Sequence, residues 1–273
     1  MAIGSYLGAR AAGGRWLVRI EDIDPPREII GAGDAILRTL GRLGLEWDGR
    51  VIWQRKNRDQ HHAALQQLGT AGQVYRCDCS RQLLSGKRYP GTCRDRALPI
   101  DVRHAIRWRV PAGEYGLVDR IQGEFKQDVQ ATFGDFVVWR AEDLPAYHLA
   151  SVIDDAAAGV TEVIRGADLL DSTPRQLALL AALRFPVPRY GHLPVARDEH
   201  GDKLSKQTGA LAVDTWPPSR VMSTVLEVLG HAPPRELWGA PAPTLLEWAI
   251  AHWRIEAIPR QVPARDWTRV LAE

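Results

Sequence analysis

The N-terminal part of the chain alternates between apolar residues spaced three or four apart and short continuous apolar runs. The first spacing is typical of amphipathic helices and the second of buried strands. These patterns predict, in order, a helix over 2–12, a strand over 15–20, a helix over 33–43, a short strand over 51–53 and a helix over 57–68. In the second helix, four residues are expected to face inward: Ile36, Leu37, Leu40 and Leu43.

The rest of the chain is more varied. Residues 75–100 are rich in basic residues and turn formers and show little periodicity. A helix over about 173–183 is predicted with Asp171 or Ser172 as its N-cap and Pro174 in its first turn. The other predicted elements are strands over 105–110, 135–139 and 160–164, β structure over 115–129, and helices near 218–229, 243–253 and 263–271. Helices and strands that alternate in this way indicate an α/β fold with a parallel sheet.

The composition is that of an ordinary globular protein, with 273 residues, 45% hydrophobic and 25% charged. A formal net charge of +2 gives little support for nucleic-acid binding by charge alone. No apolar run approaches the roughly 20 residues that cross a bilayer. The N-terminus also lacks the basic region and apolar stretch of a signal peptide. We therefore expect no membrane partner and a cytoplasmic location.

Residues 19–27 (RIEDIDPPR) end the first predicted strand with three carboxylates, two prolines and two arginines. Ligands of open α/β sheets bind beyond the carboxyl ends of the strands, where crowded acids can meet a cationic group. The prolines hold the exit of the strand extended. A solvated loop broken by prolines is the alternative, and this segment alone does not decide between the two.

Residues 203–206 (KLSK) form a second candidate site. Only five of the 35 lysines and arginines are lysines, yet Lys203 and Lys206 lie three positions apart. Lysine carries a compact, mobile charge, and two of them on one loop can stabilise the charge on a leaving pyrophosphate. The alternative is a solvated basic loop.

Together these segments resemble the class I aminoacyl-tRNA synthetases and, within that class, the glutamate-specific branch. Residues 203–206 are similar to the second signature of the class, written KMSKS, and residues 19–27 to the RIEDxDPPR-type segment of the branch. Tyr147, residues 152–155 (VIDD) and residues 163–170 (VIRGADLL) resemble the tract that lines the amino-acid and adenosine pockets. The resemblance covers residues 1 to about 210, with its segments in the family order.

The resemblance implies L-glutamate as a substrate. Glu21 would bind its ammonium group, and Tyr147 and Arg165 would contact the amino acid. An arginine suits a carboxylate because its planar fork pairs with both oxygens. An ion pair of Arg165 with a neighbouring acid is the structural alternative, and the acids concerned are Asp154, Asp155 and Asp168.

The resemblance also implies ATP, with Mg²⁺, as the second substrate. Asp168 and Ser205 would line the nucleotide pocket. Lys203 and Lys206 would hold the phosphates and act in catalysis.

Three cysteines lie close together at Cys77, Cys79 and Cys93. In a chain without a secretion signal, this number argues against a disulfide framework. With Tyr89 they resemble the small zinc site of the glutamyl-queuosine tRNA(Asp) synthetases, which implies one structural Zn²⁺. Structural zinc takes four ligands in a tetrahedron. His104 is a rival fourth ligand, and three incidental reduced cysteines are the alternative.

The length favours the same branch. Ordinary glutamyl-tRNA synthetases continue into a large anticodon-binding region, whereas only residues 211–273 follow the lysine loop here. The queuosine-modifying family attaches glutamate to the modified base in the anticodon of tRNA(Asp). We therefore expect activation of glutamate to glutamyl-adenylate and its transfer to queuosine in tRNA(Asp). The alternatives are a truncated glutamyl-tRNA synthetase that charges the 3′ end and a non-catalytic remnant.

The implied architecture is a Rossmann-like parallel-sheet catalytic domain with an inserted zinc-binding, acceptor-type subdomain and a short helical C-terminal region. We place the first catalytic part at 1–74, the insertion at 75–134, the second catalytic part at 135–210 and the C-terminal region at 211–273. A monomer is expected, because no long apolar stripe is left unassigned.

The first signature of the class, HIGH, has no counterpart before Arg19, and the first histidine is His61. The first strand and its loop are expected to be missing with it, whether the true start lies upstream or the chain is a short form. We therefore expect reduced stability and strongly reduced activity. His61 and His62 are interpreted as solvated or packing residues on the surface of a helix. His148 replaces an amide usual in the branch and predicts a glutamate affinity that varies between about pH 6 and pH 7.5.

Overall fold

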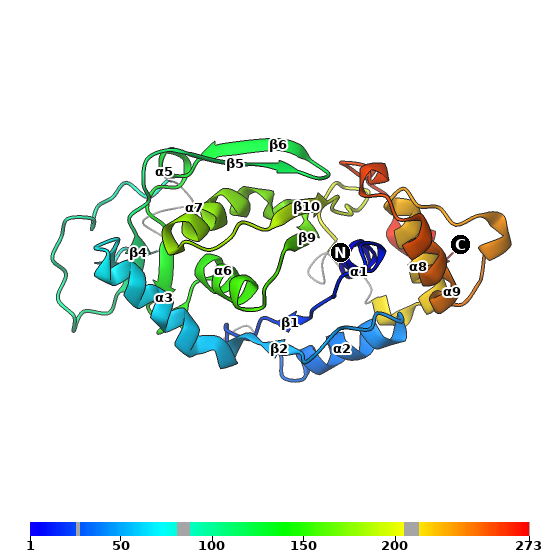
Figure 1. Ribbon diagram of the computed structural model, residues 1–273, viewed down its shortest axis with the longest axis horizontal. Helices are drawn as coiled ribbons and strands as arrows, with labels where there is room; N and C mark the ends of the chain where they lie inside the picture. The colour runs from blue at the N-terminus through cyan, green and yellow to red at the C-terminus, as the bar shows by residue number, and fades with distance from the viewer. Residues whose placement is uncertain (26–27, 81–87, 205–212, 273) are drawn as a thin grey trace.

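Two pairs of parallel strands form the centre of the computed structural model, which describes residues 1–25, 28–80, 88–204 and 213–272 (Figure 1). In the first pair, β1 (Arg19–Ile20) lies beside β2 (Ile52–Trp53). In the second, β9 (Glu162–Gly166) lies beside β10 (Arg189–Leu193). Both pairs are joined through helices, as parallel strands require. The predicted α/β fold is confirmed.

The helices around the first pair are α1 (Ala2–Ala11), α2 (Ala32–Arg42) and α3 (Arg58–Thr70), with the short helix η1 (Gln54–Asn57) before α3. Around the second pair lie α6 (Tyr147–Ala157), η2 (Ala167–Ser172) and α7 (Thr173–Leu183). Pro174 lies in the first turn of α7, and Arg184, with φ near 60°, ends it in the left-handed region. Leucines of α7 complete a core with α3, α6 and strands β4 (Ala105–Trp108) and β7 (Val137–Arg140).

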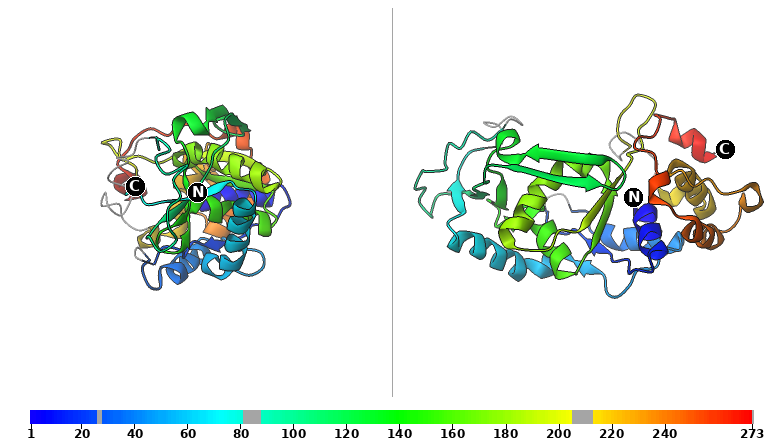
Figure 2. Two further views of the ribbon diagram at one scale, coloured as in Figure 1. Left: turned by 90° about the vertical axis from the view of Figure 1, so that its left-hand side faces the viewer. Right: turned by 45° about the horizontal axis from the view of Figure 1, so that its top comes forward.

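The insertion contributes strands to an antiparallel sheet and contains a long hairpin. The sheet has the order β3-β4-β7-β8, with β3 at Val74–Cys77 and β8 at Leu144–Pro145. The hairpin pairs β5 (Glu114–Asp119) with β6 (Gly123–Asp128) and leads into α5 (Val129–Thr132). It packs along α7 and reaches β10, which is visible in the second view of Figure 2. Strand β7 follows the predicted boundary at residue 134 and pairs with β4 before it, so this sheet spans the proposed division.

The C-terminal region packs against the N-terminal helices, at the opposite end from strand β4 and its sheet (Figure 1). Its helices are α8 (Pro218–Val228), α9 (Ala242–His252) and α10 (Trp267–Ala272), with short helices η4 (Val213–Thr215), η5 (Arg235–Leu237) and η6 (Ile255–Ala257). Leu7 of α1, Met222 of α8 and Leu245 of α9 are fully buried in one cluster. Among the described residues, no helix has both the length and the apolar character to span a membrane.

Several local predictions differ from the structure. Ile36 is 52% exposed rather than inward-facing, because it borders a cavity. The strand predicted over 15–20 pairs only at Arg19–Ile20. Strand β10 was not predicted, since its sequence RYGHL does not alternate. His61 is fully buried, so its predicted surface position is wrong.

Candidate active site

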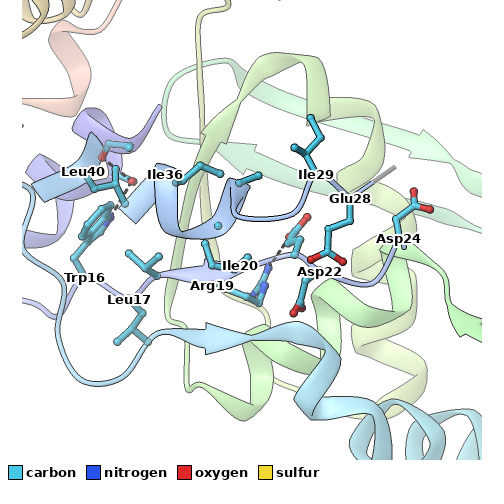
Figure 3. Close-up of a pocket in the computed structure, with 16 residues that line it drawn as sticks. Trp16, Leu17, Arg19, Ile20, Asp22, Asp24, Glu28, Ile29, Ile36 and Leu40 are labelled. Carbon is cyan, nitrogen blue, oxygen red and sulfur yellow. Dashed lines mark hydrogen bonds and ion pairs between the residues drawn. The ribbon is translucent and has the colours of Figure 1, made fainter. Parts of the chain in front are cut away.

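The segment after β1 borders a cavity of about 710 Å³ (Figure 3). Its walls come from α1, β1, the acidic segment and α2. Figure 3 shows Asp22, Asp24 and Glu28 toward one end of the cavity and Trp16 and Leu40 toward the other. The cavity therefore offers negative charge at the carboxyl end of β1, where ligands of α/β sheets bind.

Glu21 lies at this edge with its side chain 46% exposed. Its Oε1 is 3.2 Å from Nη2 of Arg19, whose Nη1 is 2.5 Å from Oδ1 of Asp155 on α6. Burial disfavours the charged form of Arg19, but the charge and hydrogen bond of Asp155 outweigh it and raise the pKa of the guanidinium. Asp22 is buried instead, and its Oδ1 accepts a hydrogen bond from the backbone N–H of Arg55 at 2.8 Å. Of the two neighbouring acids, Glu21 is thus the one exposed to a ligand.

Arg165, in β9, is held by uncharged neighbours. Its Nη2 donates to Thr173 Oγ1 at 2.8 Å and to Gln176 Oε1 at 2.6 Å, and its Nε donates to His192 Nε2 at 3.1 Å. Among the described residues it forms no ion pair with an acid, so the structural alternative from the sequence is wrong. Sequence reasoning missed these three partners, although Thr173 and Gln176 lie three positions apart and thus on one face of α7.

Tyr147 begins α6, and its ring lies 5.3 Å from the ring of His148. Burial lowers the pKa of His148 to about 3, and the charges of Arg175 and Arg165 act in the same direction. The imidazole is therefore neutral over the whole range from pH 6 to pH 7.5. The predicted pH dependence of glutamate affinity through His148 is wrong, because burial beside two cations disfavours a third positive charge.

A His148→Gln variant should lose stability less steeply in acid than the wild type. Unfolded His148 binds a proton below about pH 6.5, whereas the folded residue stays neutral until about pH 3, so the wild type is destabilised as the pH falls through this window. Between pH 6.5 and pH 5 the difference should reach about 2 kcal/mol. Urea unfolding at both pH values measures it, with the exposed His252→Gln as matched control. Equal slopes for all three proteins would contradict the assignment.

Asp168 follows β9 and meets the lysine loop. Lys203 Nζ lies 2.5 Å from Asp168 Oδ2. A Cβ on Gly166 would lie 2.3 Å from Asp168 Oδ1, so only glycine allows the carboxylate to come this close to β9. Ser205 and Lys206 lie outside the described residues. The structure thus brings one lysine of the loop to the predicted nucleotide-binding acid.

The three cysteines form a compact cluster at the end of β3. The sulfur atoms of Cys77, Cys79 and Cys93 all lie within 4.8 Å of one another. Burial and the two neighbouring thiols raise the pKa of Cys79 to about 12. At Cys77 burial is outweighed by hydrogen bonds from Tyr89 and Arg107, which lower the pKa of that thiol. Three sulfurs at this spacing fit a tetrahedral zinc ion, which would bind them as thiolates.

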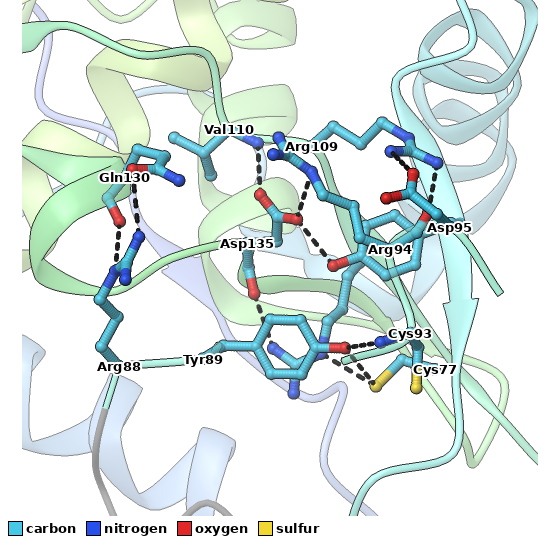
Figure 4. Close-up of polar contacts among 12 residues, drawn as sticks. Cys77, Arg88, Tyr89, Cys93, Arg94, Asp95, Arg109, Val110, Gln130 and Asp135 are labelled. Atoms are coloured by element: carbon cyan, nitrogen blue, oxygen red, sulfur yellow. Dashed lines mark hydrogen bonds and ion pairs between the residues drawn. The ribbon is translucent and has the colours of Figure 1, made fainter. Parts of the chain in front are cut away.

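Of the two candidate fourth ligands, Tyr89 lies at the cysteine cluster and His104 does not. Its hydroxyl oxygen lies 3.5 Å from Cys77 Sγ and accepts a hydrogen bond from the backbone N–H of Cys93 at 2.8 Å (Figure 4). His104 instead has its Nδ1 2.6 Å from the carbonyl oxygen of Val102 and lies outside the cluster. The geometry therefore favours a set of three cysteines and one tyrosine.

Sequence reasoning named Asp154 only in the VIDD tract and as a possible partner of Arg165, and it missed the contacts that this buried carboxylate makes. Asp154, on α6, accepts hydrogen bonds from Gln54 Nε2 at 2.6 Å, Asn57 Nδ2 at 2.8 Å and His61 Nε2 at 2.8 Å. These partners fix α6 against η1 and α3. Because Asp155 follows Asp154 directly, the same contacts hold the acid that binds Arg19.

Comparison with known proteins assigns the chain to a family. Residues 1–220 match the family model described as tRNA synthetases class I (E and Q), catalytic domain. The glutamyl-Q tRNA(Asp) synthetase of Chromobacterium violaceum is 48% identical over 279 residues, which cover 96% of this chain and 91% of that protein. The protein of the same name from Ectopseudomonas mendocina is 48% identical over 274 residues, covering 100% of this chain and 90% of that protein. The chain belongs to the glutamyl-Q tRNA(Asp) synthetase family.

A solved structure shows the same fold as this family member. The glutamate tRNA ligase from Elizabethkingia meningosepticum superposes with a TM-score of 0.80 at 22% identity. The match covers 99% of this chain and 64% of the ligase, so the chain spans less than two thirds of that protein's length. At this identity the likeness concerns the fold alone.

In this member of the glutamyl-Q tRNA(Asp) synthetase family we expect Zn²⁺ to bind the cysteine cluster, and Cys93→Ser should weaken that binding by more than about 100-fold. The hydroxyl is a poor replacement for a thiolate on zinc. Competition with a chromophoric chelator measures the affinity. Tyr89→Phe should weaken it less, and His104→Ala should leave it unchanged. A loss of affinity in His104→Ala would instead make His104 the fourth ligand.

Proposed function

We propose that this chain activates L-glutamate with ATP and Mg²⁺ and transfers the glutamate to queuosine in the anticodon of tRNA(Asp), as a ligase of the aminoacyl-tRNA synthetase type. The proposal rests on the similarity, over nearly the whole chain, to two proteins named glutamyl-Q tRNA(Asp) synthetase. The family model for the catalytic domain supports the ATP-dependent first step. The monomeric state and the cytoplasmic location of the protein both stay predictions.

In the proposed first step, an α-carboxylate oxygen of glutamate attacks the α-phosphorus of ATP. The new carboxyl–phosphate bond gives glutamyl-adenylate, and pyrophosphate leaves with the electrons of the broken P–O bond. Arg165 and Tyr147 would bind the amino acid, and Glu21 its ammonium group. The exposure of Glu21 and its place at the carboxyl end of β1 support this role.

Lys203 and Asp168 would act at the nucleotide. Their 2.5 Å contact supports a common site at the ends of β9 and β10. Lys203, with Ser205 and Lys206, would hold the phosphates, and the lysine charges would stabilise the leaving pyrophosphate. In the second step a hydroxyl of the queuosine cyclopentene-diol would attack the activated carbonyl and release AMP. The proposed Zn²⁺, on Cys77, Cys79, Tyr89 and Cys93, would be structural.

Glutamate-dependent exchange between ATP and pyrophosphate, measured without tRNA, tests the first step. Lys203→Ala should lower the exchange rate about 100-fold, because it removes the positive charge that would stabilise the leaving pyrophosphate. Lys126→Ala is the matched control, since Lys126 pairs with Glu114 on the exposed hairpin. If glutamate does not raise the exchange rate of the wild type, the result would favour the alternative that the chain is a non-catalytic remnant.

Two forms of tRNA(Asp) test the second step. The first carries queuosine but lacks the 3′-terminal adenosine, and the second has an intact 3′ end but no queuosine. Transfer of labelled glutamate to the first form only is the expected result. Transfer to the second form only would make the chain a truncated glutamyl-tRNA synthetase.

A further inference from the structure

A buried carboxylate from the hairpin lies behind the candidate glutamate site. Asp119 ends β5, and its Oδ1 accepts the backbone N–H groups of Ile121 at 2.9 Å, Gln122 at 2.8 Å and His192 at 3.0 Å. Its Oδ2 lies 2.6 Å from Nδ1 of His192. Asp119 is 3% exposed and His192 is fully buried. The two oxygens of one carboxylate thus have separate tasks: one orders the turn and the other binds an imidazole.

The contacts on both sides determine which nitrogen of His192 carries the proton. The carboxylate of Asp119 can only accept, so Nδ1 is the donor. On the other side, Nε of Arg165 lies 3.1 Å from Nε2 of His192 and can only donate, so Nε2 is the acceptor. The neutral Nδ1–H tautomer is the form that satisfies both neighbours.

We propose that Asp119 and His192 are positioning residues for Arg165. Asp119 fixes the tautomer of His192, and the lone pair on Nε2 then fixes the plane of the Arg165 guanidinium. This inference rests on the proposed function in one respect, namely that Arg165 binds glutamate.

The other contacts of Arg165 cannot replace this one. Thr173 Oγ1 and Gln176 Oε1 both bind one nitrogen, Nη2, so the contact at Nε supplies the second point that sets the orientation of the planar guanidinium group. Among the described residues, His192 is the hydrogen-bond partner of Nε. These three partners use both hydrogens of Nη2 and the hydrogen of Nε, so Nη1 is the nitrogen left for a substrate carboxylate within the described part of the chain. The direction of its N–H groups follows the guanidinium plane, which must be set before the substrate arrives.

Asp119→Asn tests the proposal with little change in shape. The carbonyl oxygen of asparagine can keep the three backbone hydrogen bonds, while its NH₂ group must donate to Nδ1 of His192. His192 should then switch to the Nε2–H tautomer, in which Nε2 can donate to Thr173 Oγ1 at 3.1 Å but no longer accepts from Nε–H of Arg165. Asp128→Asn is the matched control, since Asp128 caps α5 at the other end of the same hairpin and asparagine caps equally well.

Two measurements read the outcome. Nitrogen-15 NMR of labelled histidine and arginine reports the tautomer of His192 and the Nε–H resonance of Arg165. ATP–pyrophosphate exchange gives the KM values for glutamate and ATP. In Asp119→Asn we expect the switched tautomer, a shifted Nε–H resonance and a KM for glutamate raised about 30-fold, with the KM for ATP unchanged. Asp128→Asn should match the wild type in all four.

The results separate failure of the inference from failure of the proposed function. An unchanged tautomer, or an unchanged KM for glutamate despite the switch, overturns the positioning role. If the wild type shows no glutamate-dependent exchange, the proposed function fails, and an unshifted Arg165 resonance in Asp119→Asn then overturns the positioning role by itself.

A second pair of variants decides the question if Asp119→Asn does not fold. His192→Gln keeps a donor for Asp119 and an acceptor for Arg165, so its KM for glutamate should stay within about threefold of the wild type. His192→Leu lacks both and should show the full rise. Equal KM values for the two variants would overturn the proposal.

Discussion

Replacing Arg165 with alanine is expected to lower kcat/KM for glutamate in ATP–pyrophosphate exchange about 1000-fold. The change removes the guanidinium that we assign to the amino acid and leaves a substrate carboxylate without its charged partner. It also leaves Thr173, Gln176 and His192 facing an empty space. The KM for ATP should change little, because Lys203 and Asp168 meet at a separate point.

Two further variants distinguish a role of Arg165 in binding glutamate from a general structural role. Arg165→Lys keeps the charge but loses the planar fork, so it should recover only a small part of the activity. Arg189→Ala, at the exposed start of β10, is the matched control and should behave as the wild type. If Arg165→Ala raised the KM values for glutamate and ATP equally, Arg165 would have a general structural role instead.

Asp154→Ala is expected to lower the free energy of unfolding by about 4 kcal/mol. Asp154 is 1% exposed and accepts from three side chains, which would be left as buried donors without an acceptor. Those hydrogen bonds outweigh burial and lower the pKa of Asp154. Its stabilising effect is therefore present above about pH 4 and is lost as the pH falls through its lowered pKa.

Urea unfolding at pH 7 measures the effect of Asp154→Ala. Asp95→Ala is the matched control, because Asp95 is 90% exposed and pairs with Arg109 only at the surface. The control should change the stability by less than about 0.5 kcal/mol. A similar small change in Asp154→Ala would show that water or a rearranged α6 satisfies the three donors.

Local patterns predicted the elements whose stability depends on nearby residues. Helix α7 was placed at its observed bounds because Pro174, the leucine spacing and the polar residues before it are all contained within a few turns. The motif segments were equally visible, since residues 19–27 and 203–206 carry their chemistry in one continuous stretch. Membership of the family, which the comparisons show, could be inferred from these segments.

The predictions that failed depend on residues far apart in the chain. Ile36 has the spacing of a core residue, but it borders the cavity and its side chain is 52% exposed. The sequence presents His148 as an ordinary titratable group, and only the fold buries it and places Arg175 and Arg165 near it. The spacing of residues in a helix or strand shows which of them share a face. It does not show which side chains of other elements pack against that face.

The sequence by itself determined the class of fold, the order of most helices and the segments that carry the candidate chemistry, because each of these depends on residues within a few positions of one another. Only the tertiary structure decided which groups hold the candidate site in place. Asp119 and His192 are 73 positions apart, and His61 and Asp154 are 93 apart. A buried polar group must find a partner wherever the fold provides one, and that partner has no signature near it in the sequence.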